Sequence, residues 1–229
     1  MAECFLNRQI IVEGGSDTTS FDYTNITHYF DLNSLDLENN QWLNTLGTDY
    51  FSLKDGFIED NALKIIPGGY GEISCPLPNT IYIIVKKFST TGDECIIGKG
   101  CTRSSSSYGF GLFLDSKTGY HLSITSSPYV ETERDDNYHV FALSGFLNLN
   151  TNGTKAIMMF KDGILQGFLT GFQTGNYAGF ITLNRVYYGG YSYPGIQDTY
   201  IKMVALGSEQ TIEQIVSNSK YLYNKYIGG

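Results

Sequence analysis

Residues 154–170 read TKAIMMFKDGILQGFLT, and this stretch carries most of the information about the fold. Two runs rich in apolar residues, 154–161 and 164–170, meet at the pair Asp162-Gly163. Asp-Gly is favoured at the centre of a type I′ turn, whose twist matches that of two antiparallel strands. The stretch therefore predicts a β-hairpin.

Similar short apolar runs occur on both sides of this hairpin and are separated mostly by turn residues. Regularly spaced short strands without intervening helices are typical of a β-sandwich or jelly roll rather than of βαβ units. The clearest further strands are expected at 81–88, 94–97, 108–115, 120–125, 138–147, 180–188 and 200–206, with shorter candidates at 29–32, 57–58 and 62–66.

The C-terminal segment has the pattern of a helix. Its apolar residues recur at spacings of three, four and seven, which places them on one stripe, and Ser208 is a suitable N-cap. The stripe consists of Ile212, Ile215, Val216, Leu222, Tyr223 and Tyr226. We therefore expect an all-β fold, a two-sheet antiparallel β-sandwich of the jelly-roll type, closed by a short C-terminal helix.

The chain divides at one plausible boundary. Residues 5–12 are strand-like, and the Gly-, Ser- and Thr-rich residues 13–20 follow as a flexible joint. We expect an N-terminal arm at 1–20 and a single sandwich domain at 21–229. Such an arm could add a strand to its own sheet or to a neighbouring subunit.

Charge and hydropathy exclude several partners. The 229 residues carry 15 Lys and Arg against 23 Asp and Glu, a net charge of −8, so nucleic acid is a poor partner. No apolar run approaches the roughly 20 residues that span a bilayer, so no membrane insertion is expected. The N-terminus lacks the basic and then apolar layout of a secretion signal, which predicts synthesis in a cytoplasm.

No cofactor or metal is expected. The cysteines form no C-x-x-C pair and the histidines are scattered, whereas a structural zinc site needs closely paired ligands. Buried thiols are the main expectation, and a Cys95–Cys101 bridge is the alternative. The residues concerned are Cys4, Cys75, Cys95, Cys101, His28, His121 and His139.

Five segments together resemble the concanavalin A-like lectin/glucanase superfamily in its laminin-G-like version. Residues 138–143 (YHVFAL) are similar to its W-H-H-V-A strand, and 157–163 (IMMFKDG) to its L-Y-V-D-G hairpin. Residues 181–184 (ITLN), 200–206 (YIKMVAL) and 211–215 (TIEQI) match its next strand, its I-D-x-V-R-I-Y strand and its closing S-x-x-E-I helix.

This resemblance implies two antiparallel sheets packed face to face, with ligands on the concave sheet or at loop tips. The chain departs from the pattern at Tyr138, where the family has Trp, and at Lys202, where it has an acidic residue. Calcium-binding members use dense loop carboxylates, and no run here has that density.

The candidate catalytic residues are better explained by structural roles than by catalysis. Glu131, Glu133 and Asp135 alternate as in the acidic trio of retaining glucanases, but Pro128 and the pair Asp136-Asn137 favour a solvated acidic turn. No G-x-S-x-G motif accompanies His139 or His121, so histidines bonded to backbone are expected. The Ser-rich run 104–107 lacks the Gly-Lys-Ser/Thr of a phosphate loop. No enzymatic activity is predicted.

Residues 187–195, YYGGYSYPG, are the best candidate for a contact surface. Tyrosines among glycines and a proline form rigid amphipathic rings that can stack on a sugar, anchor a protein interface or simply pack. Trp42 lies in loop 36–47, which is polar and expected to be exposed, and it has the same alternatives. The candidate contact residues are Trp42, Tyr187, Tyr188, Tyr191 and Tyr193.

These expectations together predict that the protein is a binding or assembly module. The first hypothesis is a component of a phage virion surface, either a capsid decoration protein or a tail adhesin, which binds other virion proteins or a second copy of itself. It could also bind a host-surface glycan. A carbohydrate-binding module of a secreted bacterial protein is the alternative, and a glycanase or polysaccharide lyase using Glu131 and Glu133 is the third.

Overall fold

The computed structural model describes residues 19–87, 93–99, 110–115, 119–124, 129–133, 135–145, 157–169, 180–188 and 191–228. Within these ranges the chain forms β-strands, one 3-10 turn at Leu32–Ser34 and one α-helix. The elements are β1 (Ile26–Asp31), β2 (Leu35–Asp36), β3 (Gln41–Leu43), β4 (Tyr50–Glu59), β5 (Ala62–Ile73), β6 (Thr80–Lys87), β7 (Asp93–Lys99), β8 (Phe110–Asp115), β9 (Gly119–Ile124), β10 (Tyr129–Thr132), β11 (His139–Ser144), β12 (Ile157–Lys161), β13 (Ile164–Leu169), β14 (Ile181–Leu183), β15 (Arg185–Tyr188), β16 (Tyr191–Pro194), β17 (Thr199–Gly207) and α1 (Ile212–Tyr226).

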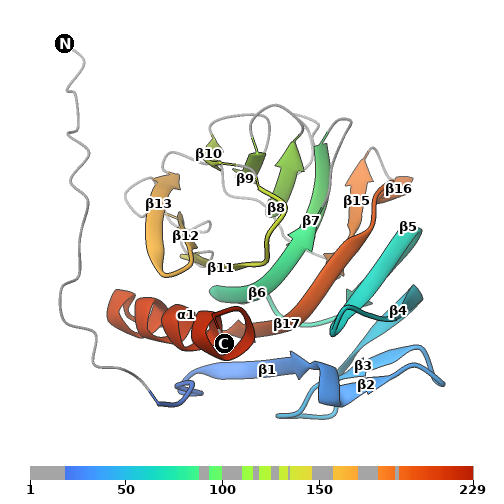
Figure 1. Ribbon diagram of the computed structural model, residues 1–229, viewed down its shortest axis with the longest axis horizontal. Coiled ribbons are helices and arrows are strands. Elements are labelled where there is room, and N and C mark those ends of the chain that lie inside the picture. Colours follow the sequence, from blue (N-terminus) through green and yellow to red (C-terminus); the bar gives the residue numbers. More distant parts are fainter. Residues whose placement is uncertain are drawn as a thin grey trace.

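The strands form two antiparallel layers, which confirms the predicted all-β sandwich (Figure 1). The back layer has the order β5-β17-β6-β11-β12-β13, and β1 also pairs with β17. The front layer has the order β10-β9-β8-β7-β14-β5-β4-β3-β2. In Figure 1, α1 lies on the side of the back layer that faces away from β7–β10.

The long strand β5 belongs to both layers. Its first half pairs with β17, where Ile65 faces Thr199, and its second half pairs with β14, where Gly71 faces Leu183. Between the halves lie Pro67 and Gly68, and Gly68 has φ +87°, a conformation that glycine adopts without steric cost. This bend lets hydrogen bonding pass from one layer to the other.

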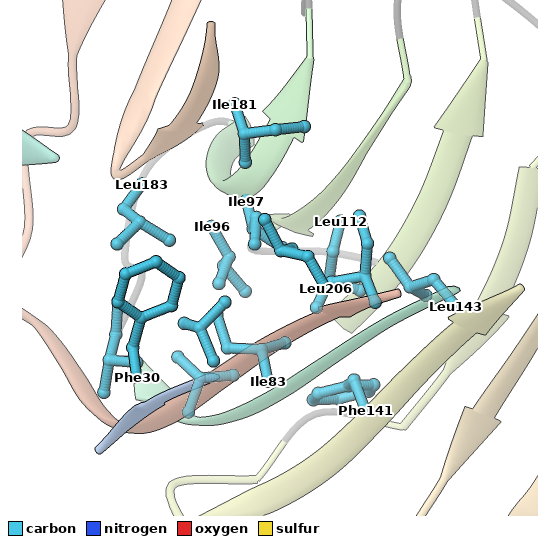
Figure 2. Packing of buried hydrophobic residues seen from close by; sticks show 14 of the residues in the cluster. Phe30, Ile83, Ile96, Ile97, Leu112, Phe141, Leu143, Ile181, Leu183 and Leu206 are labelled. Atoms are coloured by element: carbon cyan, nitrogen blue, oxygen red, sulfur yellow. The ribbon is translucent and has the colours of Figure 1, made fainter. Parts of the chain in front are cut away.

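The main hydrophobic core fills the space between the layers. Alternate residues of β6 lie in this core together with Ile201, Val204 and Leu206, which lie on either side of the bulge of β17. Figure 2 shows Ile83 and Leu206 in the same cluster as Ile97 and Leu112 of the front layer. Phe141 and Leu143 extend this core along β11. The alternation is that of strands with one face on a sandwich core.

The opposite face of the back layer packs on α1, so β6 is buried on both sides. Tyr82 and Ile84 lie in a second apolar cluster together with Ile215 and Leu222 of the helix, which confirms the predicted apolar stripe. The helix begins after Thr211 and not after Ser208 as the sequence suggested. Thr211 Oγ1 accepts from the Gln214 backbone N–H, and the Gln214 side chain accepts from the Thr211 N–H.

Removal of this capping box is expected to weaken the attachment of α1. Thr211→Ala should lower the free energy of unfolding by about 1 kcal/mol, because a helix N–H loses its partner. Urea denaturation followed by circular dichroism measures the change. Ser208→Ala is the matched control and should leave stability nearly unchanged; the reverse order of effects would show that the helix start is misplaced.

The hairpin predicted at Asp162-Gly163 is confirmed. Lys161 pairs with Ile164, and the two loop residues have φ +54° and +79°, as a type I′ turn requires. Across the described residues, no helix is both long and apolar enough to cross a membrane.

Candidate functional site

The tyrosine-rich segment forms a small hairpin of its own, which we call the tyrosine hairpin and define as β15 and β16. Its backbone pairs Tyr188 with Tyr191 and Tyr187 with Ser192. It connects β14 of the front layer to β17 of the back layer. The side chains of Tyr187, Tyr188, Tyr191 and Tyr193 lie outside the described residues, so their role as contacts stays a prediction.

Trp42 is not a surface residue, and this prediction was wrong. Loop 36–47 contains the strand pair β2–β3, and the Trp42 side chain is 0% exposed in the main core beside Phe30 and Phe51. Its indole N–H donates to the Asp31 carbonyl at 2.6 Å. The polar neighbours in the sequence face outward while Trp42 faces inward, because strand side chains alternate.

The base of the tyrosine hairpin is a buried polar network centred on Asn184. This residue has φ +53° and separates β14 from β15. Its Oδ1 accepts from Lys87 Nζ at 2.6 Å and from Thr199 Oγ1 at 2.7 Å, and its Nδ2 donates to the Gly69 carbonyl at 3.1 Å. One amide thus links the hairpin to β6, β17 and the bend of β5.

Lys87 brings a positive charge into this network. Its side chain is fully buried, and Nζ also donates to Thr199 Oγ1 and to the Gln197 carbonyl. Burial of an ammonium group is costly unless oxygen acceptors surround it. Its acceptors come from both sides of the tyrosine hairpin along the chain, with Asn184 before it and Gln197 and Thr199 after it. Movement of the hairpin would take these acceptors away from the buried charge, so one position of the hairpin is favoured.

Gly195, at the end of β16, is required by the same network. Its N–H donates to the Asn184 carbonyl at 2.7 Å, and its carbonyl accepts from Gly68 N–H at 2.9 Å. A Cβ at this position would lie 2.2 Å from Asn184 Oδ1, far inside contact distance. The two strands of the hairpin are therefore joined at its base by a backbone hydrogen bond, and the residue after β16 is bonded to the bend of β5.

The second anchor is Arg185, the first residue of the tyrosine hairpin. Arg185 Nη1 donates to Glu72 Oε2 at 2.6 Å, and the guanidinium carbon lies 3.8 Å from the centre of the Tyr70 ring. The Arg185 side chain is only 12% exposed. Partial burial strengthens this ion pair and the cation–π contact.

A row of polar and small residues crosses the front layer and includes Glu72 of this anchor. Strand register places residues from seven strands directly opposite one another, with Glu72 next to Thr182 and Thr182 next to Gly98. The full row is Gln41, Ser52, Glu72, Thr182, Gly98, Gly111 and Ser123. Adjacent core positions are large and apolar, so this row belongs to the face that turns away from the core.

The three alternating carboxylates do not share a strand. β10 ends at Thr132, so Glu133 and Asp135 lie beyond it, and Glu133 is exposed. Glu131 is paired with His121 of β9 in the backbone register, while the side chains of both lie outside the described part of the chain. Among the three, Asp135 is the carboxylate for which the structure gives a partner.

His139 is buried as predicted, and its ring nitrogens lie against two carboxylates, which the sequence did not lead us to expect. Its Nε2 lies 2.8 Å from Asp135 Oδ1 and its Nδ1 lies 2.7 Å from Asp162 Oδ2. Asp162 also accepts from the Val140 N–H at 2.9 Å. The histidine thus joins the loop before β11 to the β12–β13 turn.

The pH dependence of this contact follows from Asp135. Burial raises the pKa of Asp135, but hydrogen bonds from His139 and the Asn137 N–H, with the charges of His139 and Lys161, outweigh burial and hold it at about 2. A depressed carboxyl pKa stabilises the fold above the unfolded value near 4, and this stabilisation is lost as pH falls toward 2. Asp135→Asn should therefore be less stable than wild type at neutral pH, with the difference shrinking between about pH 4 and 2.

Denaturant unfolding at several pH values measures this effect. Asp55→Asn is a control, since Asp55 lies 3.9 Å from the exposed Lys54 and its side chain is 49% exposed. A difference between Asp135→Asn and wild type that does not change down to pH 2 would contradict the assignment.

The cysteines and the Ser-rich run add little to the description of the site. Cys95 is buried and Cys75 half-buried, whereas Cys4, Cys101 and the run 104–107 lie outside the described residues. Within the described ranges, no group of three His, Cys, Asp or Glu side chains is arranged to hold a metal ion.

Comparison with known proteins gives likeness of fold alone. No family model matches the chain, and no curated protein matches its sequence. A sialidase of Trypanosoma rangeli in complex with sialic acid superposes with TM-score 0.61 and 12% identity over 91% of this chain and 34% of that one. A second structure, described as Trypanosoma rangeli sialidase, superposes with TM-score 0.61 and 14% identity over 89% of this chain and 33% of that one.

A neurotoxin domain has the same degree of likeness. The receptor-binding domain of botulinum neurotoxin, C/D mosaic serotype, superposes with TM-score 0.62 and 11% identity over 90% of this chain and 52% of that one. The chain thus spans about a third of the sialidases and half of the neurotoxin structure. A sheet-rich, lectin-like fold is consistent with both, while membership of a family is not established.

The sialidases also correct one prediction. The sequence led us to expect a protein without enzymatic activity, but proteins named as sialidases share this fold across 89% of the chain. The fold therefore gives no ground for excluding catalysis. At 14% identity over a third of the sialidase, it does not establish an enzymatic identity either.

Sequence reasoning missed the anchors of the hairpin. Lys87 reads as the polar end of a strand, and Asn184 and Arg185 read as ordinary positions in a strand predicted to run unbroken over 180–188. The signal that was available is Asn184 itself, because an asparagine inside an apolar run often marks a residue with positive φ.

Proposed function

We propose that this chain is a glycan-binding module whose contact surface is the tyrosine hairpin together with the neighbouring face of the front layer. The observation that carries the proposal is the way the hairpin is mounted. The tyrosine hairpin, with its four tyrosines, is attached to a buried network of Asn184, Lys87 and Thr199. Gly195 joins its two strands at the base through a backbone hydrogen bond to Asn184.

A hairpin that is anchored in this way suits contacts with sugars. Tyrosine rings present a flat apolar face and a hydroxyl, and so fit the faces and hydroxyls of a sugar ring. A preorganised hairpin loses little conformational entropy on binding, which leaves more of the contact energy as affinity. In the polar row across the front layer, Thr182 is fully buried, so the exposed Ser52 and the half-buried Gln41 and Glu72 are the residues that would offer hydrogen-bonding groups.

The solved structures with a similar fold support a binding role in general terms. One sialidase in the comparison is described in complex with sialic acid, and the neurotoxin structure is described as a receptor-binding domain. Both descriptions concern binding, and the shared fold makes a binding role reasonable for this chain as well.

The test is a broad glycan array followed by calorimetric titration of the best ligand. Tyr188→Ala and Tyr191→Ala should each weaken binding about tenfold or more, as expected for aromatic residues at the centre of a contact. Tyr223→Ala on α1 is the control, because this tyrosine is exposed and lies on a different element. A blank array, or equal losses for all three variants, would refute the proposal.

A more specific setting stays a prediction. A place on the surface of a phage virion, beside other virion proteins or a second copy of the chain, was expected from the sequence, with secretion from a bacterium as the alternative. The test is co-sedimentation of the purified chain with phage capsids and tails, together with its mass in solution. A monomer that binds neither particle would remove the virion prediction and leave the glycan proposal in place.

A further inference from the structure

Beyond the C-terminal end of α1, the helix-facing side of the back layer carries alternating lysines and tyrosines. Strand register places Lys64, Tyr200 and Lys86 directly opposite one another on β5, β17 and β6. Tyr138 immediately precedes β11, whose first residue pairs with Val85. We call these four residues the lysine–tyrosine row, and Lys202 lies beside it at a bulge of β17.

The ammonium groups lie over the tyrosine rings. Lys86 Nζ is 4.8 Å from the ring centres of both Tyr138 and Tyr200, and Lys202 Nζ is 4.2 Å from that of Tyr138. Two cations are thus held against one ring in a protein whose net charge is −8.

Carboxylates are distributed unevenly along the row. Lys64 lies 3.0 Å from both Glu59 and Asp198. At the other end, Lys86 lies 3.9 Å from Asp60, whose side chain is 65% exposed, and Lys202 Nζ donates to the Tyr226 carbonyl at 2.9 Å. Burial lowers the pKa of Lys202, and the nearby charge of Lys86 lowers it further. Lys86 and Lys202 therefore place two positive charges beside the Tyr138 ring.

The Tyr138 hydroxyl is the second observation. Its oxygen is buried and has no hydrogen-bond partner in the structure. A buried hydroxyl without a partner loses the energy of its hydrogen bonds to water, so such groups usually mark a missing acceptor or donor. The hydroxyl and both ammonium groups can donate, which suits an oxyanion as the missing partner.

We propose that Lys86, Lys202 and Tyr138 form an anion subsite that takes the carboxylate or sulfate group of an acidic glycan. The inference rests on the proposed function, adds to it a contact on the helix-facing side of the back layer, apart from the tyrosine hairpin, and narrows the ligand from glycans in general to acidic ones. The two lysine side chains are flexible, so they can shift from the ring and admit the anion. A tyrosine ring beside the charge supplies the apolar surface that a sugar ring also needs.

The first experiment uses inorganic sulfate and does not depend on finding the glycan. In NMR spectra that resolve the lysine side chains, sulfate should shift the signals of Lys86 and Lys202 with saturation and raise the pKa of Lys202. Lys54, 56% exposed and outside the row, is the internal control and should show only the weak effect of ionic strength. Linear, equal shifts for all three lysines would overturn the subsite.

The second experiment compares acidic and neutral glycans on the same array. The double variant Lys86→Gln, Lys202→Gln should bind acidic glycans about tenfold or more weakly, because hydrogen bonds to charged groups are strong. Its affinity for neutral glycans should not change. Tyr138→Phe should reduce the affinity for acidic glycans to a smaller extent. Lys86→Arg keeps the positive charge and should therefore retain more of that affinity than Lys86→Gln. Thermal unfolding of each variant shows whether it is folded.

The outcomes separate the two proposals. If the tyrosine hairpin variants lose binding while the lysine variants bind acidic glycans normally, the module is a lectin and the anion subsite is wrong. If sulfate saturates Lys86 and Lys202 but the array is blank, the subsite binds free anions only, so its assignment to a glycan and the proposed function both fail.

Discussion

Replacing Asn184 with alanine is expected to lower the free energy of unfolding by about 3 kcal/mol or more. The substitution removes the oxygen that accepts from Lys87 and Thr199 and the N–H group that donates to the Gly69 carbonyl. A buried ammonium group that loses an acceptor is far more costly than a lost surface hydrogen bond. Urea denaturation, followed by circular dichroism, measures the loss.

Asn184→Gly is the matched variant. Asn184 has φ +53°, which alanine adopts only with strain of roughly 1–2 kcal/mol, whereas glycine adopts it freely. The glycine variant should therefore recover only this strain and keep most of the loss. Wild-type stability in Asn184→Gly would show that the amide network contributes nothing. We also expect weaker glycan binding in both variants, because the tyrosine hairpin loses its anchor.

Trp42→Ala should have a comparable effect, about 3–5 kcal/mol, as is typical for a large aromatic residue removed from a core. Trp42 packs against Phe30 and Phe51, with ring centres 5.8 and 6.3 Å away, and its N–H is bonded to the Asp31 carbonyl. Because it is the only tryptophan of the chain, unfolding must be followed by circular dichroism and not by tryptophan fluorescence.

Leu43→Ala is the neighbouring control. Leu43 is 39% exposed on the same strand, so its removal should change stability by less than about 0.5 kcal/mol. At a temperature where Trp42→Ala is still folded, its affinity for any bound glycan should equal that of the wild type. A loss of affinity without a loss of stability would instead support the surface role first expected for Trp42.

The strand pattern was the most predictable part of the molecule. The hairpin at Asp162-Gly163 and the apolar stripe of α1 depend on turn chemistry and periodicity, which are local properties of the chain. The interruption at Asn184 was not predictable in the same way, because the surrounding residues continue a strand pattern and the break is stabilised by contacts with β5, β6 and β17.

The candidate site was predictable only in part. The tyrosines between 187 and 193 stand out by composition, and their backbone does form a hairpin. Trp42 was misjudged because polar neighbours in the sequence suggested a loop, whereas a strand of only three residues is enough to turn one side chain into the core. The lysine–tyrosine row could not be foreseen, since its four residues come from positions 64, 86, 138 and 200.

By itself, the sequence determined the all-β class, the closing helix, the acidic surface charge and the presence of a tyrosine-rich segment. These follow from composition, turn residues and hydrophobic periodicity, all of which act over a few neighbouring residues. The tertiary structure decided which polar side chains meet, because the pairing of strands distant along the chain brings Lys87 to Asn184, His139 to Asp162 and Lys202 to Tyr138. Those contacts depend on long-range register, which no local pattern encodes.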